Sequence, residues 1–323
     1  MLYFLIALLL VCILLILFAT RPKLNTTAPA SKVPDGLSLV ELNIWLKKTE
    51  SETIGIKAGA EALIEFSDEE SPSITDHCFL YIHGFSASRQ ETSPVTSRIA
   101  DHFNANVFHV RLAGHGTGSE GMVSSAETWL QSMIDAWKIS NYLGHRIVIV
   151  ATSTGAPLTV WLLNQIGVAN KVAAILLISP NFSIKNPFGF LLTWPLSSHW
   201  IHFLLGKTHS WEAESAEHEK VWTSSYSTLA IIEMQKITDW IASIDLKTMS
   251  TPLAMMCMAN DPTVSSKAAS KAFKLWGSEV KSHIPISKNA DNIEHVFVGK
   301  LAGPDRTDET VEVFTQFLEP ILR

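Results

Sequence analysis

A short run of small residues in the middle of the chain, Val150-Ala151-Thr152-Ser153-Thr154-Gly155, joins an apolar segment to a helical pattern. Residues 147–150 predict a strand, and apolar residues recur at helical spacing beyond Pro157, which is tolerated in a helix's first turn. A strand-to-helix turn that exposes a nucleophilic serine needs such small neighbours, in the pattern G-x-S-x-G, whose first glycine is replaced here by Ala151. The pattern alone also fits an ordinary helix whose N-terminus a hydroxyl side chain caps.

A nucleophilic serine requires an imidazole base and a carboxylate that orients the imidazole. Asp261 follows the apolar run 252–258, and the loop after a strand is where the acid is expected; the alternative is a turn that begins before Pro262. His295 lies between the predicted last strand, residues 280–286, and the final helix. We predict Asp261 as the acid and His295 as the base, with a surface loop histidine as the alternative for the latter.

Two other residues compete for these roles. His283 falls inside the predicted last strand, which does not suit a base that must reach Ser153. Asp291 lies only four residues before His295 and after that strand, so it is a poorer candidate for the orienting carboxylate.

The oxyanion of the reaction needs hydrogen-bond donors. Residues 79–82 predict a strand that ends at His83-Gly84-Phe85, where the glycine allows backbone amides to approach a ligand closely. We predict the amides of Phe85 and of Thr154, the residue after the nucleophile, as the two donors. A plain turn at the end of a strand is the alternative for residues 83–84.

Five motifs occur together in one order: His83-Gly84-Phe85-Ser86-Ala87-Ser88-Arg89-Gln90-Glu91, Arg111-Leu112-Ala113-Gly114-His115-Gly116, Thr152-Ser153-Thr154-Gly155, Asn260-Asp261-Pro262-Thr263-Val264 and Glu294-His295-Val296. Over residues 75–323 the chain resembles the α/β-hydrolase superfamily, and most of all its bacterial carboxylesterase, monoacylglycerol lipase and serine aminopeptidase-like branch. The resemblance implies an α/β fold with a mostly parallel eight-stranded sheet, helices on both faces and a helical cap insertion. It also implies the triad Ser153, Asp261 and His295, with no cofactor and no metal.

Composition limits the partners. The 323 residues are 47% hydrophobic, enough for one large α/β core, and the net charge of −6 without a basic run excludes nucleic acid as an expected partner. The three cysteines, Cys12, Cys78 and Cys257, lack the spacing of a disulfide frame or a zinc site.

The N-terminal segment Leu2–Ala19 is uncharged, and we predict a single-pass membrane anchor at residues 1–20. A cleaved signal peptide is the alternative, although no basic residue precedes the apolar run. Residues 21–36 read as a linker and residues 37–323 as the hydrolase domain. The basic residues Arg21, Lys23 and Lys32 follow the apolar run, which favours the cytoplasmic side for the enzyme.

Residues 181–246 interrupt the alternation of strands and helices and predict a cap over the carboxyl edge of the sheet. Five of the ten tryptophans lie in this segment: Trp194, Trp200, Trp211, Trp222 and Trp240. They predict an apolar acyl-binding site, or else they attach the cap to the core.

These features together predict a serine hydrolase that cleaves small-molecule or lipid esters with an apolar acyl group. One alternative is an aminopeptidase or amidase, in which a cap carboxylate binds the substrate ammonium; the candidates are Glu212, Glu214, Glu217 and Glu219. Their spacing also fits a solvated helix face. A second alternative is a non-catalytic binding protein on a hydrolase fold.

Overall fold

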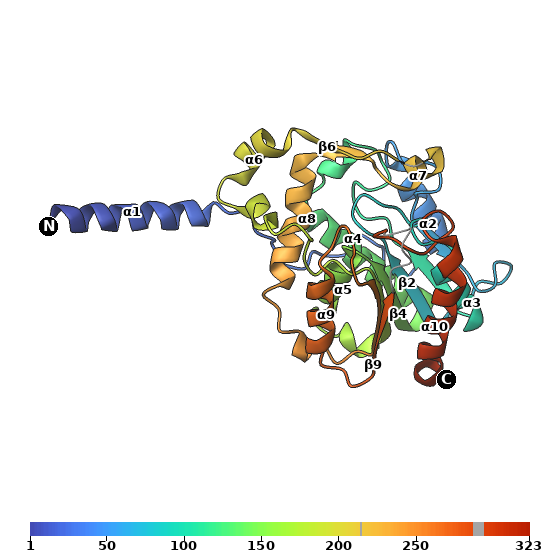
Figure 1. The fold of residues 1–323 in the computed structure, drawn as a ribbon. Helices are drawn as coiled ribbons and strands as arrows, with labels where there is room; N and C mark the ends of the chain where they lie inside the picture. Colours follow the sequence, from blue (N-terminus) through green and yellow to red (C-terminus); the bar gives the residue numbers. More distant parts are fainter. Residues whose placement is uncertain (214, 287–293) are drawn as a thin grey trace.

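The computed structural model describes residues 1–213, 215–286 and 294–323, and a twisted sheet runs through its centre (Figure 1). In these residues the sheet has seven strands in the order β1-β3-β2-β4-β5-β8-β9. The strands are β1 (Leu63–Glu65), β2 (Thr75–Ile82), β3 (Asn106–His109), β4 (Gly144–Thr152), β5 (Val172–Ile178), β8 (Leu253–Met258) and β9 (Lys281–Ile286). Only β1 is antiparallel to its neighbour among these strands.

The predicted fold class is confirmed, with one strand fewer than expected in the described residues. The chain before β1 makes turns instead of another edge strand. Gly55 and Gly59 adopt φ values of 82° and 86° there, a left-handed conformation that ends extended pairing.

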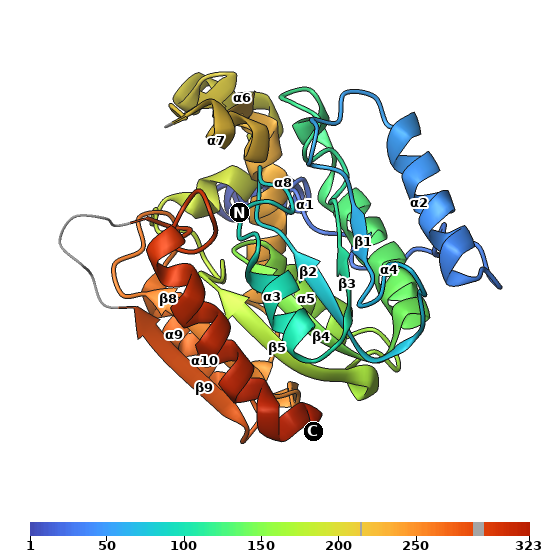
Figure 2. The same ribbon diagram turned by 90° about the vertical axis from the view of Figure 1, so that its right-hand side faces the viewer.

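Helices cover both faces of the sheet, as a buried parallel sheet requires. They are α2 (Leu39–Glu52), α3 (Val95–His102), α4 (Ala126–Leu143), α5 (Gly155–Leu163), α9 (Ser266–Leu275) and α10 (Pro304–Leu322), with 3-10 turns at Gly121–Val123, Ala169–Lys171 and Leu246–Thr248. Figure 2 shows α3 and α10 across the face that is turned to the viewer. Alternate residues of β2 divide between two cores: Leu80 packs with α4 and α5, whereas Phe79 and Tyr81 pack with α3 and α10.

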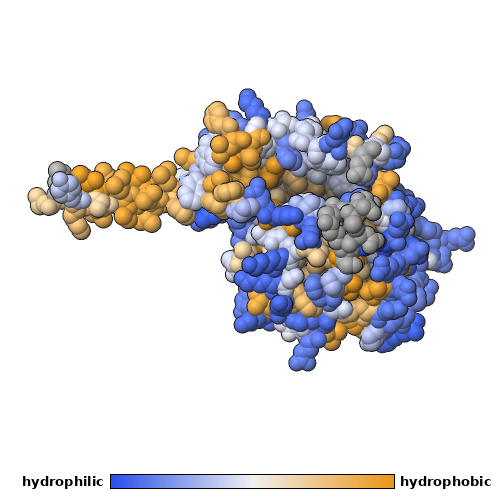
Figure 3. Space-filling view, viewed as in Figure 1, coloured by the Kyte–Doolittle hydropathy of each residue, from blue (hydrophilic) through white to orange (hydrophobic). Residues whose placement is uncertain are grey.

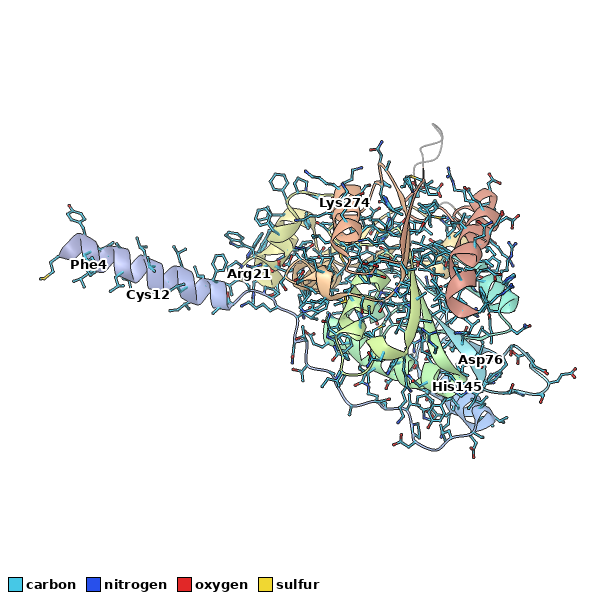
Figure 4. The ribbon with its side chains drawn as sticks, turned by 90° about the horizontal axis from the view of Figure 1, so that it is seen from below. Phe4, Cys12, Arg21, Asp76, His145 and Lys274 are labelled. Atoms are coloured by element: carbon cyan, nitrogen blue, oxygen red, sulfur yellow. The ribbon has the colours of Figure 1, made fainter. Side chains whose placement is uncertain are left out.

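The chain between β5 and β8 forms a cap over one end of the sheet (Figure 1). Its elements are a 3-10 turn (Gly189–Thr193), α6 (Ser197–Leu205), β6 (Thr208–Ser210), α7 (Ala216–Val221), β7 (Ser225–Ser227) and α8 (Thr228–Ile241). Strands β6 and β7 pair as a small antiparallel hairpin. The sequence analysis predicts a cap made of helices alone, so this hairpin is not foreseen there. The opposite end of the sheet carries Asp76 and His145, near the amino ends of β2 and β4 (Figure 4).

The first helix, α1 (Leu2–Ala19), projects from the body and presents an apolar surface (Figures 1 and 3). The prediction of a membrane anchor here is wrong, because no helix in the described residues is both long enough and apolar enough to cross a membrane. The predicted membrane localisation, its side and the membrane partner are corrected with it.

Residues 21–36, which are predicted as a linker, lie against the body. Arg21, at the base of α1 (Figure 4), donates from Nε to the carbonyl of Thr193 over 3.1 Å. Further along, the Ser31 hydroxyl and the Lys32 amide both donate to Asp135 of α4, over 2.8 and 2.7 Å. The segment is therefore held to the body by hydrogen bonds at both ends.

Candidate active site

Ser153 occupies a strained turn between β4 and α5. Its φ is 50°, a left-handed value that is uncommon for a residue with a side chain. Its amide donates to Ile178 of the neighbouring strand over 3.0 Å. A Cβ on Gly155 would lie 2.5 Å from the carbonyl oxygen of Ile82, so this position requires glycine, whereas Ala151 is accommodated inside β4. The turn therefore fixes the hydroxyl at the carboxyl end of the central strand.

The structure brings Ser153, His295 and Asp261 into one hydrogen-bonded chain. His295 Nε2 lies 2.8 Å from Ser153 Oγ, and His295 Nδ1 lies 2.7 Å from Asp261 Oδ2. An ionised carboxylate only accepts hydrogen bonds, so it holds the proton on Nδ1 and leaves Nε2 of the neutral ring free to accept from the hydroxyl. Such a chain can draw the proton from the serine as the oxygen attacks an electrophile.

Further hydrogen bonds hold Asp261 and His295 in place. Asp261 is 2% exposed, and its Oδ1 accepts from the amides of Thr263 and Val264 over 2.8 and 2.9 Å. The carbonyl of His295 accepts from the Ser179 hydroxyl over 2.5 Å. Asp261 is thereby held within its own loop, and His295 is held at Ser179, the residue after β5.

The competing residues lie elsewhere or outside the described chain. His283 sits on β9 with Nε2 3.2 Å from Cys257 Sγ, and its ring stacks on Phe273. Asp291 lies outside the described residues. His115, which belongs to the motif at residues 111–116, is buried against the rings of Phe85 and Trp129.

The amides of Phe85 and Thr154 flank the serine from two loops. Among the described residues, no hydrogen bond engages either amide. The carbonyl of Gly84 accepts from Ala87 N over 3.3 Å and lies 2.8 Å from His83 Nδ1. Because a trans peptide points its carbonyl and its N–H in opposite directions, this fixes where the Phe85 N–H points.

A cavity of about 460 Å³ lies between the triad and the cap, within the usual size range of small-ligand sites. The body contributes Phe85, Ser153, Thr154 and His295, and the cap contributes His209, Trp211, Trp222, Tyr226 and Met234. Of the five cap tryptophans, Trp211 and Trp222 line this cavity; Trp194 is instead in ring contact with Phe18 of α1. A second cavity, of about 430 Å³, lies at α2 and β1, away from the triad.

Glu91 also lines the cavity of the triad; it lies in the motif of residues 83–91, and no role is predicted for it from the sequence. Its side chain is 2% exposed, and burial raises the pKa of this carboxyl to about 7 against the opposing effect of a hydrogen bond from the Gly84 amide. An acidic residue shortly after the turn at Gly84 was the available signal. Nothing in the sequence shows that this residue is buried.

A serine in a strand-to-helix turn, with an acid and a histidine after later strands of a doubly covered parallel sheet, defines the α/β-hydrolase class. Residues 79–293 match the model of the alpha/beta hydrolase family, and the chain belongs to this family. The resemblance noted from the motifs is thus confirmed. A comparison with curated protein sequences found no match.

Several solved structures share the fold. One comes from LipS and LipT, two metagenome-derived lipolytic enzymes, with a TM-score of 0.66 and 19% identity over 82% of this chain and 99% of that chain. A monoacylglycerol lipase of Paleococcus ferrophilus gives 0.56 and 12% over 80% and 97%. A soluble variant of monoglyceride lipase from Saccharomyces cerevisiae, in complex with a substrate analog, gives 0.59 and 12% over 80% and 91%. At these identities the likeness establishes the fold.

Proposed function

We propose that the protein is a serine hydrolase that cleaves carboxylic esters with an apolar acyl group through an acyl-enzyme on Ser153. The observation that carries this proposal is the continuous hydrogen-bonded chain from Ser153 Oγ through His295 to Asp261, with distances of 2.8 and 2.7 Å. A binding protein on the same fold has no use for such a chain. The reaction requires neither a metal nor a cofactor.

The proposed reaction has two halves. Ser153 Oγ attacks the ester carbonyl while its proton passes to His295 Nε2, and Asp261 stabilises the imidazolium. The amides of Phe85 and Thr154 donate to the oxyanion. When the intermediate collapses, the alcohol leaves with the proton from His295, and the acyl group stays on the serine. His295 then takes a proton from water, which attacks the acyl-enzyme and releases the acid.

The ester class is supported by the cavity and by the structural relatives. Trp211, Tyr226 and Met234 give the cap side of the cavity an apolar character suited to an acyl chain. The relatives with this fold include lipolytic enzymes and monoacylglycerol lipases. A neutral apolar acyl group can pack against these side chains.

Turnover of a panel of p-nitrophenyl esters tests the proposal. We expect hydrolysis by the wild-type protein and a loss of about four to six decades in kcat for Ser153→Ala and His295→Ala, because triad members act as a unit. Circular dichroism and melting curves check that both variants fold. Absence of ester turnover by folded wild-type protein, or full activity of Ser153→Ala, would contradict the proposal.

One observation favours an aminopeptidase as the second candidate. Glu212 lines the cavity and can face a substrate ammonium, although its side chain is exposed. Glu214 lies outside the described residues. An aminoacyl anilide in the same assay separates the two activities: cleavage of the anilide with kcat/KM above that of the esters would favour the peptidase.

A further inference from the structure

We propose that Glu91 is a positioning residue for this hydrolysis: its carboxylate holds the Gly84–Phe85 peptide of the oxyanion hole and ties it to the cap. The inference rests on the proposed function, and it adds a residue outside the triad. Glu91 Oε2 accepts from the Gly84 amide over 2.7 Å and from the Tyr81 hydroxyl over 3.2 Å. The side chain of Trp222, a cap residue, hydrogen-bonds to the same carboxylate.

These bonds fix the peptide that carries the Phe85 amide. The Gly84 N–H is bound to Glu91, and the Gly84 carbonyl is bound by Ala87 N. With both ends of Gly84 held, the plane of the next peptide cannot rotate, and the Phe85 N–H keeps one direction. A donor that is already oriented stabilises the oxyanion without reorganisation during the reaction.

Glu91 and Ser153 flank the same glycine. A Cβ on Gly84 would lie 2.7 Å from Glu91 Oε1 and 3.1 Å from Ser153 Cβ. The Tyr81 hydroxyl lies 3.3 Å from Oγ1 of Thr152, the residue before the nucleophile. Glu91 therefore connects to both strands that carry the site, β2 and β4.

The cap is attached at the same place. The amide of Thr223 donates to the carbonyl of Ser86 over 2.7 Å, and Lys57 Nζ donates to the carbonyl of Trp222 over 3.1 Å. Trp222 also lines the cavity of the triad. Residues 222–223 thus join the cap to the oxyanion loop, and Glu91 lies at this junction.

A buried carboxyl is costly, and an apolar side chain would fill the same volume without that cost. Burial raises the pKa of Glu91 to about 7, while the Gly84 amide and the nearby His295 favour the charged form. The carboxylate offers acceptor sites to three donors at once. A neutral amide cannot do so, because its NH₂ group would face one of these donors.

The variant Glu91→Gln tests the proposal. We expect kcat for a p-nitrophenyl ester to fall at least about 10-fold with KM within about threefold of wild type, since misplacement of a donor acts on the transition state. Affinity for an alkyl trifluoromethyl ketone, which forms an oxyanion on the serine, should fall by the same factor as kcat/KM. Glu91→Asp should recover part of both.

The matched control is Asp135→Asn. Asp135 also accepts from a backbone amide and a hydroxyl, over 2.7 and 2.8 Å, but on the outer side of α4. The Asp135→Asn variant should have the same kcat and the same affinity for the ketone as the wild type. Tyr81→Phe removes one bond to Glu91 and should lower kcat and the affinity for the ketone by about threefold. This variant tests the proposal if Glu91→Gln does not fold.

Unchanged kcat in folded Glu91→Gln would overturn the positioning role, as would a lower kcat with unchanged ketone affinity. If Glu91→Gln does not fold, unchanged values in Tyr81→Phe have the same effect. Failure of the proposed function is a separate result: the wild-type protein would then not turn over the ester at all.

Discussion

Both carboxylate oxygens of Asp261 are engaged in hydrogen bonds. Oδ1 is bound by two backbone amides of its own loop, and Oδ2 faces His295 Nδ1 at 2.7 Å. We expect Asp261→Asn to lower kcat about 10⁴-fold, because the amide favours the wrong imidazole tautomer. Steady-state ester kinetics measure this, with Asp291→Asn as a control that should be nearly silent. The reverse pattern would show that the acid is Asp291.

His83 makes stability depend on pH. Burial lowers the pKa of His83 to about 4. Its Nε2 accepts from the Leu112 amide over 3.1 Å, and protonation of Nε2 would remove this bond. Because the folded-state pKa lies below the unfolded value of about 6.5, the unfolded chain binds the proton first, and the contribution is present above pH ~6.5 and lost as pH falls to ~4.

Urea unfolding at a series of pH values measures this effect. Between pH ~6.5 and ~4 the free energy of unfolding of the wild type should fall by up to about 3 kcal/mol more than that of His83→Gln. Glu91 affects the free energy of unfolding in the opposite direction: since its pKa is raised to about 7, its contribution rises as the pH falls from ~7 to ~4.5. Both proteins contain Glu91, so the difference between their curves cancels this contribution. Parallel pH curves for the two proteins would contradict the account.

At the residue scale, the sequence located the three side chains that the fold brings together, because each follows a recognisable strand. Glu91 was missed for a physical reason. Its role depends on three donors that converge from β2, the loop at Gly84 and the cap. Burial of a carboxylate is a tertiary property, and no local pattern reports it.

At the element scale, the central strands were the easiest to predict. Strand β8 differs by one residue from the predicted 252–258, and β4 contains the predicted residues 147–150. A strand that is buried on both faces must be apolar throughout. The edge strand β1, with three residues, and the hairpin β6–β7 lack such a continuous apolar run. Whether a short polar segment forms a strand depends on the segments that pack beside it in the fold.

The N-terminal segment allows a prediction by truncation. Removal of residues 1–19 should change the melting temperature by less than about 2 °C, since the side chains of α1 are mostly exposed. Removal of residues 1–32 also deletes the donors to Glu127 and Asp135 and should lower it by about 4–8 °C. Differential scanning calorimetry measures both. Equal melting temperatures would show that residues 20–32 contribute no stability.

The cap allows a second prediction at this scale. Trp211 lines the cavity, whereas Phe203 on α6 is 80% exposed and does not. Trp211→Ala should raise KM for long-chain esters about 10-fold or shift the preferred chain length, because it removes apolar contact with the acyl group. Phe203→Ala should leave the chain-length profile unchanged. A lower melting temperature for Trp211→Ala with unaltered selectivity would show that this tryptophan only packs the cap.

At the scale of the whole molecule, the three residues of the candidate site lie at one edge of the sheet. Ser153 follows β4, Asp261 follows β8 and His295 follows β9, so parallel strands deliver all three to the carboxyl end. This topology made the site predictable from the sequence. The membrane prediction is wrong at the same scale, because none of the described helices is long and apolar enough to cross a membrane.

We propose Ser153 as the nucleophile of an ester hydrolase. The most direct measurement is reaction of the full-length protein with a fluorophosphonate, followed by mass spectrometry of the whole protein and of its peptides. We expect one adduct per chain, on Ser153, and none in folded Ser153→Ala. An adduct on another residue, or labelling that persists in Ser153→Ala, would contradict it.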